Sequence, residues 1–237
     1  MFGPDPIDLY DPSPYGPLAY YGHLLIGVVA LTAALVALFV IKGGKTHRLS
    51  GYVYMTAVGV VCLTSISMLR NVFIPPLFMA VFTAVYCVGG AWLALRRRSS
   101  SVLAAEVGLT IFEIVGLLIF LQIAFGAAAK GLIPSFAPYV IAAIPAFLII
   151  GDLNWFLRQK QRARLRIPRH LSRMIWGFVV VLRAPLVELA AAGVPIPQSA
   201  FIIGPIVLAF ALIWYFRRKA ARGQRRVEPQ TKSVAMT

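Results

Sequence analysis

The segment KGGKTHRLSGY, residues 42–52, separates two long apolar runs and decides the fold. One run covers residues 19–41 and the other covers residues 48–69. An apolar helix of about 20 residues crosses the roughly 30 Å hydrocarbon core of a bilayer. Within lipid, helices and closed barrels are the structures that satisfy their own backbone hydrogen bonds. The segment therefore predicts a polar turn between two membrane-spanning helices.

The composition of the whole chain extends this prediction. Of 237 residues, 59% are hydrophobic and 13% are charged, whereas soluble domains carry about 25% charged residues. We expect an all-α polytopic bundle of seven transmembrane helices in residues 19–216, flanked by a short acidic tail, 1–18, and a basic tail without fixed structure, 217–237. The expected spans are 19–41, 48–69, 75–95, 102–125, 139–157, 170–192 and 198–216.

The basic residues predict the orientation of the bundle. Twenty of the 23 lysines and arginines lie in four segments, residues 42–48, 96–98, 158–173 and 217–232. Seven spans place all four on one side, which the positive-inside rule assigns to the cytoplasm, so the N-terminus is expected outside and the C-terminus inside. Because topology explains the net charge of +15, no nucleic-acid partner is expected.

Ionisable residues within the expected spans are the first candidate functional groups. Each costs about 2.5–3.5 kcal/mol to insert at a helix centre, so such residues tend to face the bundle and find partners. Glu113 and Arg183 are expected at similar depth, which predicts a buried ion pair. Glu188 and His23 are expected near the outer boundary, where a hydrogen bond between them is plausible, and Asp152 is expected near the inner boundary. These groups either fix helix packing or line a proton or substrate path.

Histidines at the inner boundary are the second candidate group. His47 opens the second span, and His170 and Arg173 open the sixth. Imidazole can ligate haem iron, shuttle protons or simply occupy the polar boundary. His47 and His170 are thus candidate axial ligands of a b-type haem, with Arg173 near a haem propionate. Gly177 would admit either a neighbouring helix or a flat ligand. No Cys/His zinc cluster is present in the sequence, so no other metal site is expected.

These motifs resemble a known family. His23, the run KTHRLSGYVY (45–54) and the run RHLSRM (169–174) are similar to the bacterial membrane-protein family catalogued as domain of unknown function 2306. The resemblance covers about residues 20–215 and implies a multi-pass protein of the bacterial inner membrane without an established activity.

Three functional hypotheses follow from these residues. The leading one is a membrane redox or b-type haem-associated protein using His47 and His170. The first alternative is a small proton-coupled transporter in which Glu113, Arg183, Glu188 and His23 line an aqueous path. The second is a non-catalytic accessory or assembly subunit, working with a membrane-complex partner or as a homo-oligomer. In each case the partners include membrane lipids, with anionic lipid at the basic tail. Enzymatic activity is left open.

Overall fold

The structure, a computed structural model, describes residues 16–133, 135–191, 193–195, 197, 200 and 203–234. Side chains at 187, 188, 190, 191 and 220–234 are not described. Every regular element in these ranges is helical. The α-helices are α1 (Pro17–Phe39), α2 (Lys45–Asn71), α3 (Pro75–Ala94), α4 (Ser100–Ala129), α5 (Ala137–Leu157), α6 (Arg162–Ala191) and α8 (Gly204–Val234), and a 3₁₀ turn, η2 (Gln159–Gln161), precedes α6.

Local sequence signals explain where several helices begin. Prolines occupy the first turns of α1, α3 and α5, where a missing N–H costs no helical hydrogen bond. Ser99 caps α4, because its Oγ accepts a hydrogen bond of 3.2 Å from the Val102 amide. Gly43, with φ of +79°, makes the turn between α1 and α2. The polar turn predicted from residues 42–52 is thus confirmed as a break between two helices.

Five helices, α1 to α5, are long and apolar enough to cross a membrane. This supports the membrane assignment, and the all-helical class is confirmed for the described residues.

Two boundaries differ from expectation. Residues 162–169, expected to be loop, form the first turns of α6, and the tail expected to lack fixed structure continues α8 as far as Val234. Arg162 and Arg169 of the first segment form ion pairs inside the bundle, which holds this segment in place, whereas Arg164 and Arg166 are exposed.

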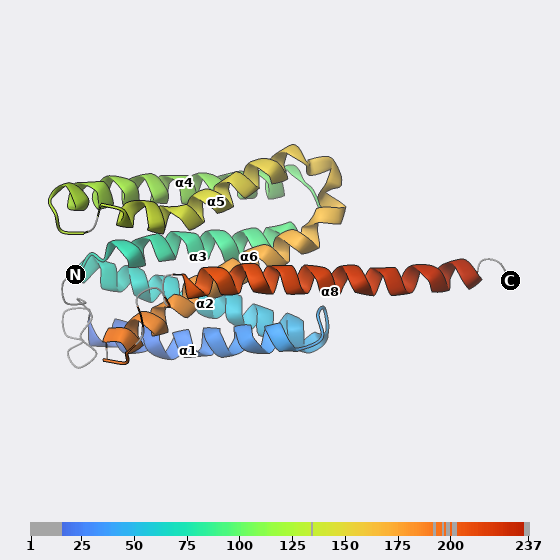
Figure 1. Ribbon diagram of the computed structural model, residues 1–237, viewed down its shortest axis with the longest axis horizontal. Coiled ribbons are helices and arrows are strands. Elements are labelled where there is room, and N and C mark those ends of the chain that lie inside the picture. The colour runs from blue at the N-terminus through green and yellow to red at the C-terminus, as the bar shows by residue number, and fades with distance from the viewer. Residues whose placement is uncertain are drawn as a thin grey trace.

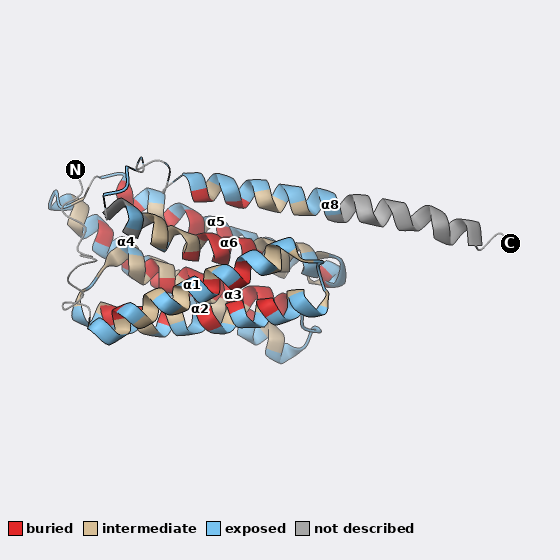
Figure 2. Ribbon diagram, turned by 90° about the horizontal axis from the view of Figure 1, so that it is seen from below, coloured by how far each residue is buried: buried red, intermediate tan, exposed pale blue. Residues whose placement is uncertain are grey.

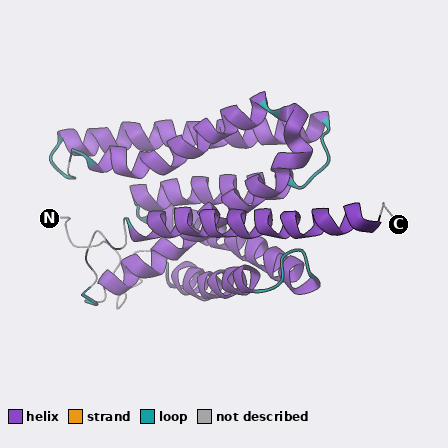
Figure 3. Cartoon of the chain, turned by 45° about the vertical axis from the view of Figure 1, so that its right-hand side comes forward, coloured by secondary structure: helices purple, strands orange, loops and turns teal. Residues whose placement is uncertain are grey.

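The helices are antiparallel and form layers (Figures 1 and 3). α3 and α6 lie in the middle, α4 and α5 cover one side, α1 and α2 cover the other, and α8 packs along α6 and projects beyond the bundle. The turn between α1 and α2, the turn between α3 and α4, and η2 lie at one end, and both the α2–α3 and α4–α5 connections lie at the other. The basic segments therefore gather at one end.

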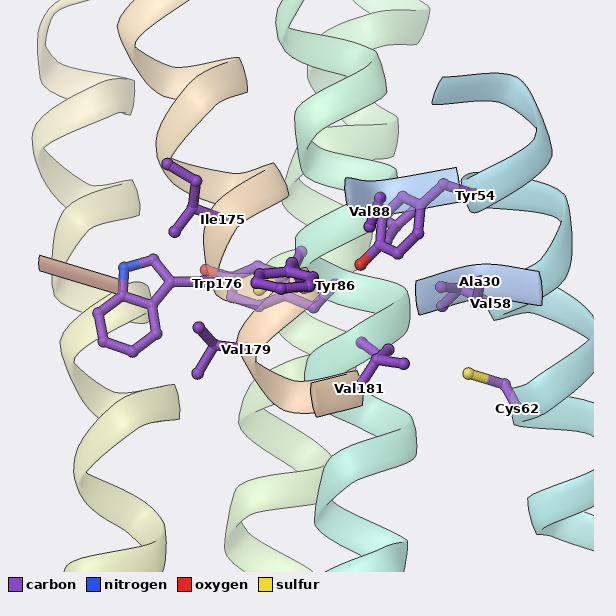
Figure 4. Packing of buried hydrophobic residues seen from close by; sticks show 14 of the residues in the cluster. Ala30, Tyr54, Val58, Cys62, Tyr86, Val88, Ile175, Trp176, Val179 and Val181 are labelled. Carbon is purple, nitrogen blue, oxygen red and sulfur yellow. The ribbon is translucent and has the colours of Figure 1, made fainter. Parts of the chain in front are cut away.

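The main core lies where α2, α3 and α6 meet, and Figure 4 shows Tyr54, Tyr86 and Trp176 among its members. Gly177 of α6 makes this contact close, because an added Cβ would lie 3.2 Å from the Tyr54 hydroxyl and 3.3 Å from Val88 Cγ2. Neighbouring helices, rather than a flat ligand, therefore occupy the space beside Gly177.

Apolar side chains also cover the outside of the bundle. Figure 2 shows exposed residues along the outer faces of α1 and α2, and among them Leu25 and Leu63 are 66% and 68% exposed. Residues of this kind avoid water, so the outer surface suits lipid contact.

Candidate functional site

Two stripes of polar side chains lie inside the bundle. On α4, Glu106, Thr110 and Glu113 follow an i, i+4, i+7 pattern and share one buried face. On α6, Arg162, Arg169 and Arg173 follow an i, i+7, i+11 pattern and share another. With Thr83 and Tyr86 of α3 and Asp152 of α5 they form what we call the polar ladder, defined as residues 83, 86, 106, 110, 113, 152, 162, 169 and 173.

Asp152 is the centre of the polar ladder and is 1% exposed. Its Oδ2 accepts hydrogen bonds from the Tyr86 hydroxyl at 2.6 Å and from the Thr110 hydroxyl at 2.9 Å. Its Oδ1 forms ion pairs with Arg169 Nη1, at 2.6 Å, and with Arg173 Nη2. One carboxylate thus joins four helices and compensates two buried cations.

Arg173 joins this cluster through Nη2, whereas its buried Nη1 has no hydrogen-bond partner among the described residues. Besides Asp152, its Nη2 donates to the Leu148 carbonyl at 2.8 Å and to the Tyr86 hydroxyl at 3.0 Å, and its guanidinium lies 4.3 Å from the Tyr86 ring centroid. The side chain is 4% exposed. Arg173, expected near a haem propionate, lies inside the bundle and has Asp152 as its anionic partner.

Glu106 and Arg162 form a second ion pair close to the end of the bundle where the basic segments gather. Arg162 Nη1 donates to Oε2 at 2.8 Å and Nη2 donates to Oε1 at 3.0 Å, a bidentate geometry. Nη2 also donates to the Leu93 carbonyl at 3.0 Å. The Trp155 ring lies 4.8 Å from the guanidinium of Arg162 and 4.6 Å from that of Arg169, so it joins the two ion pairs.

Glu113 occupies the other end of the polar ladder and is 0% exposed. Its Oε1 accepts a hydrogen bond of 2.8 Å from the Thr83 hydroxyl, whereas its buried Oε2 has no hydrogen-bond partner among the described residues. The predicted ion pair with Arg183 is not formed, and within the same part of the chain the buried Nε of Arg183 also lacks a partner. Arg183 lies ten residues after Arg173, which at 3.6 residues per turn turns it about 80° away from the inward stripe.

His23, near the opposite end of the bundle, is held by α2. Its Nδ1 lies 3.2 Å from the Thr64 hydroxyl and 3.3 Å from the Ser65 hydroxyl. The predicted partner, Glu188, has a side chain outside the described residues. His23 is separate from the polar ladder, which lies on α3 to α6.

His47 and His170 make the same kind of contact, from Nδ1 to a backbone carbonyl. His47 Nδ1 donates to the Ala37 carbonyl at 3.1 Å, and His170 Nδ1 donates to the Ala91 carbonyl at 3.0 Å. A proton on Nδ1 leaves Nε2 of each neutral ring with a free lone pair. Among the described residues, no group of three or more His, Cys, Asp or Glu is arranged to hold a metal ion.

Sequence reasoning missed part of the polar ladder. The spacing of Arg162, Arg169 and Arg173 is visible in the sequence and could have shown that a basic loop was the inward face of a helix. Nothing in the sequence distinguishes Tyr86 or Thr110 from other residues of their spans, because their role depends on how α3, α4 and α5 are rotated.

Comparison with known proteins gives no indication of the chemistry of the site. The chain matches no family model, no curated protein and no solved structure.

Proposed function

We propose that the chain is a seven-span protein of a bacterial inner membrane, a member of the family that its histidine motifs resemble, and a small proton-coupled transporter. Five apolar helices support the membrane placement, and α6 and α8 are the proposed sixth and seventh spans. The gathering of basic segments at one end of the bundle supports a cytoplasmic C-terminus and an external N-terminus (Figure 1).

The unpaired oxygen of Glu113 is the observation that carries the transport proposal. Glu106 and Asp152 each contact at least one arginine and hold fixed, compensated charges. In the part of the chain that the structure describes, Glu113 has one neutral donor, Thr83, and no ion pair. Ionisable groups inside a membrane bundle commonly belong to proton relays. Oε2 of Glu113 is the atom at which we propose that a proton binds and leaves.

Polar contacts continue from Glu113 toward the basic end of the bundle. Thr83 contacts Glu113, and Tyr86, one turn further along α3, contacts Asp152. Asp152 in turn contacts Arg169 of α6. This route replaces the one expected from sequence, since His23 and Arg183 lie off the polar ladder.

Proton binding at Glu113 is tested by infrared difference spectroscopy of the detergent-purified protein during a pH titration. We expect a C=O stretch of a protonated carboxyl group that titrates in the wild type and is lost in Glu113→Gln. The matched control is Gln122→Ala, which changes an exposed polar residue of the same helix. A titrating band that persists in Glu113→Gln would contradict the proposal.

Proton movement is tested in liposomes that contain a pH-sensitive dye and carry a potassium diffusion potential. We expect the wild type and Gln122→Ala to acidify the lumen at the same rate and Glu113→Gln to do so at least tenfold more slowly. Equal rates for all three proteins would exclude Glu113 from the path, whatever the infrared result.

The shared geometry of His47 and His170 favours a second candidate function, a b-type haem site. A histidine that ligates a metal commonly donates its other ring N–H to a carbonyl, as both residues do. Absorbance of the air-oxidised and dithionite-reduced protein tests this. We expect a Soret band that is lost in His47→Ala and in His170→Ala and kept in His23→Ala. A featureless spectrum from cells supplied with haem would remove this candidate, and failure of both functions would favour the accessory subunit.

A further inference from the structure

An apolar groove runs along the outside of the bundle between α1 and α2. Its volume is about 420 Å³. α1 contributes Val29, Thr32, Ala33 and Val36, and α2 contributes Leu49 and Val53. Thr46 and Ser50 line the end of the groove nearest the turn at residues 40–44. The lining atoms are almost all apolar, because the Ser50 hydroxyl donates to the Thr46 and His47 carbonyls of its own helix.

The depth of the groove matches one leaflet of a bilayer. Its α2 side extends from Thr46 to Val53, seven residues or about 10 Å at 1.5 Å per residue. One leaflet contributes about half of the roughly 30 Å hydrocarbon core. A groove that begins at the basic turn thus reaches through most of the inner leaflet.

The segment beside this end of the groove is cationic. Residues 40–52 contain three basic residues and no acid. Lys42 is occupied elsewhere, because its Nζ donates to the Ala37 and Leu38 carbonyls at 2.7 and 2.6 Å and lies 4.5 Å from the Phe216 ring centroid. Partial burial and, secondarily, Lys219 also lower the pKa of Lys42.

Lys45, in contrast, is exposed and forms no ion pair within the described part of the chain. It directly precedes Thr46, which lines the end of the groove nearest the turn, and the α2 start that it occupies has no side-chain cap. An exposed lysine next to an apolar groove complements a molecule with an anionic head and an aliphatic chain.

We propose that this groove binds the acyl chain of an anionic phospholipid and that Lys45 contacts the phosphate. The apolar lining and the length of about 10 Å fit a segment of one acyl chain. The proposal rests on the membrane orientation given above and not on proton transport.

Native mass spectrometry of the full-length protein tests the site, using added phosphatidylglycerol and, for comparison, phosphatidylcholine with the same chains. The wild type is expected to retain one phosphatidylglycerol in preference to phosphatidylcholine. One basic residue near an anionic headgroup contributes about 1 kcal/mol, so Lys45→Ala should weaken phosphatidylglycerol binding about fivefold. Arg97→Ala, which removes an exposed charge from the α3–α4 turn, is the control for diffuse attraction and should have little effect.

A second pair of variants tests the groove itself. Thr32→Trp fills it, whereas Leu35→Trp adds the same ring to an exposed position of α1 that does not line it. We expect Thr32→Trp to lower retention of both lipids at least tenfold and Leu35→Trp to leave it unchanged.

Four outcomes would overturn the proposal. These are equal retention of the two lipids by the wild type, equal losses in Lys45→Ala and Arg97→Ala, full retention in Thr32→Trp, and a dimer mass that Thr32→Trp abolishes, which would assign the groove to a second copy of the chain.

Discussion

Replacing Asp152 with asparagine should destabilise the protein more than any other single change in the polar ladder. The substitution keeps the size of the side chain and removes its charge. Arg169 and Arg173 then lose the anion that both contact, although each remains buried. Tyr86 and Thr110 lose a charged acceptor at the same time.

The size of the effect follows from these contacts. Removing one partner of a buried ion pair costs about 3–5 kcal/mol, because the remaining charge stays buried without compensation. In a chain of this length each kcal/mol shifts the melting temperature by roughly 2–4 °C. Asp152→Asn should therefore lower the apparent melting temperature by about 6–20 °C.

Tryptophan fluorescence during heating in a mild detergent measures this shift, since Trp155 contacts Arg169. Asn154→Ala, which alters an exposed residue of the same helix, is the control and should melt with the wild type. Replacing the whole cluster with apolar residues, Asp152→Leu with Arg169→Met and Arg173→Met, should recover much of the loss. The reasoning is refuted if Asp152→Asn melts within 2 °C of the wild type, because roughly 2–4 °C corresponds to only 1 kcal/mol.

Two further predictions use the same melting assay. Gly116→Ala should destabilise the protein by about 1–3 kcal/mol, because the added Cβ would lie 2.1 Å from Phe82 Cδ1. Gly108→Ala, whose Cβ would meet nothing within 4 Å, should be neutral or slightly stabilising, and equal effects of the two changes would contradict this packing. Thr110→Val should cost about 1.5–3 kcal/mol by removing a hydrogen bond to a charged group. In a protein in which Asp152 has already been replaced, Thr110→Val should cost little further stability. A full additional loss of stability in that protein would show that the two residues are uncoupled.

The sequence predicts the helices well because membrane insertion depends on length and apolar content. The first five spans are found within a few residues of their expected bounds. The prolines in the first helical turns and the polar turn at Gly43 can be read directly from the sequence. The sequence predicts too late a start for α6, because its first arginines resemble those of a solvated loop. A count of charges does not distinguish an exposed arginine from one that pairs with a carboxylate on another helix.

The side-chain partners could not be predicted in the same way. Depth alone suggested that Glu113 and Arg183 would meet, but contact also requires both helices to be rotated toward each other, and Arg183 points elsewhere. Glu113 was correctly expected to be buried, as was Asp152 near the basic end, yet the contacts of each depend on which helices are neighbours. One sequence does not specify those neighbours.

The three inward arginines also constrain how the chain is assembled. Arg162, Arg169 and Arg173 lie on the helix that is synthesised after the segments carrying Glu106 and Asp152. All three lie in the first part of α6, where each needs an anion once it is buried. Because the carboxylates precede their cations in the chain, α4 and α5 are synthesised before the helix that needs them. A chain interrupted before residue 162 would leave Glu106 and Asp152 without their cations.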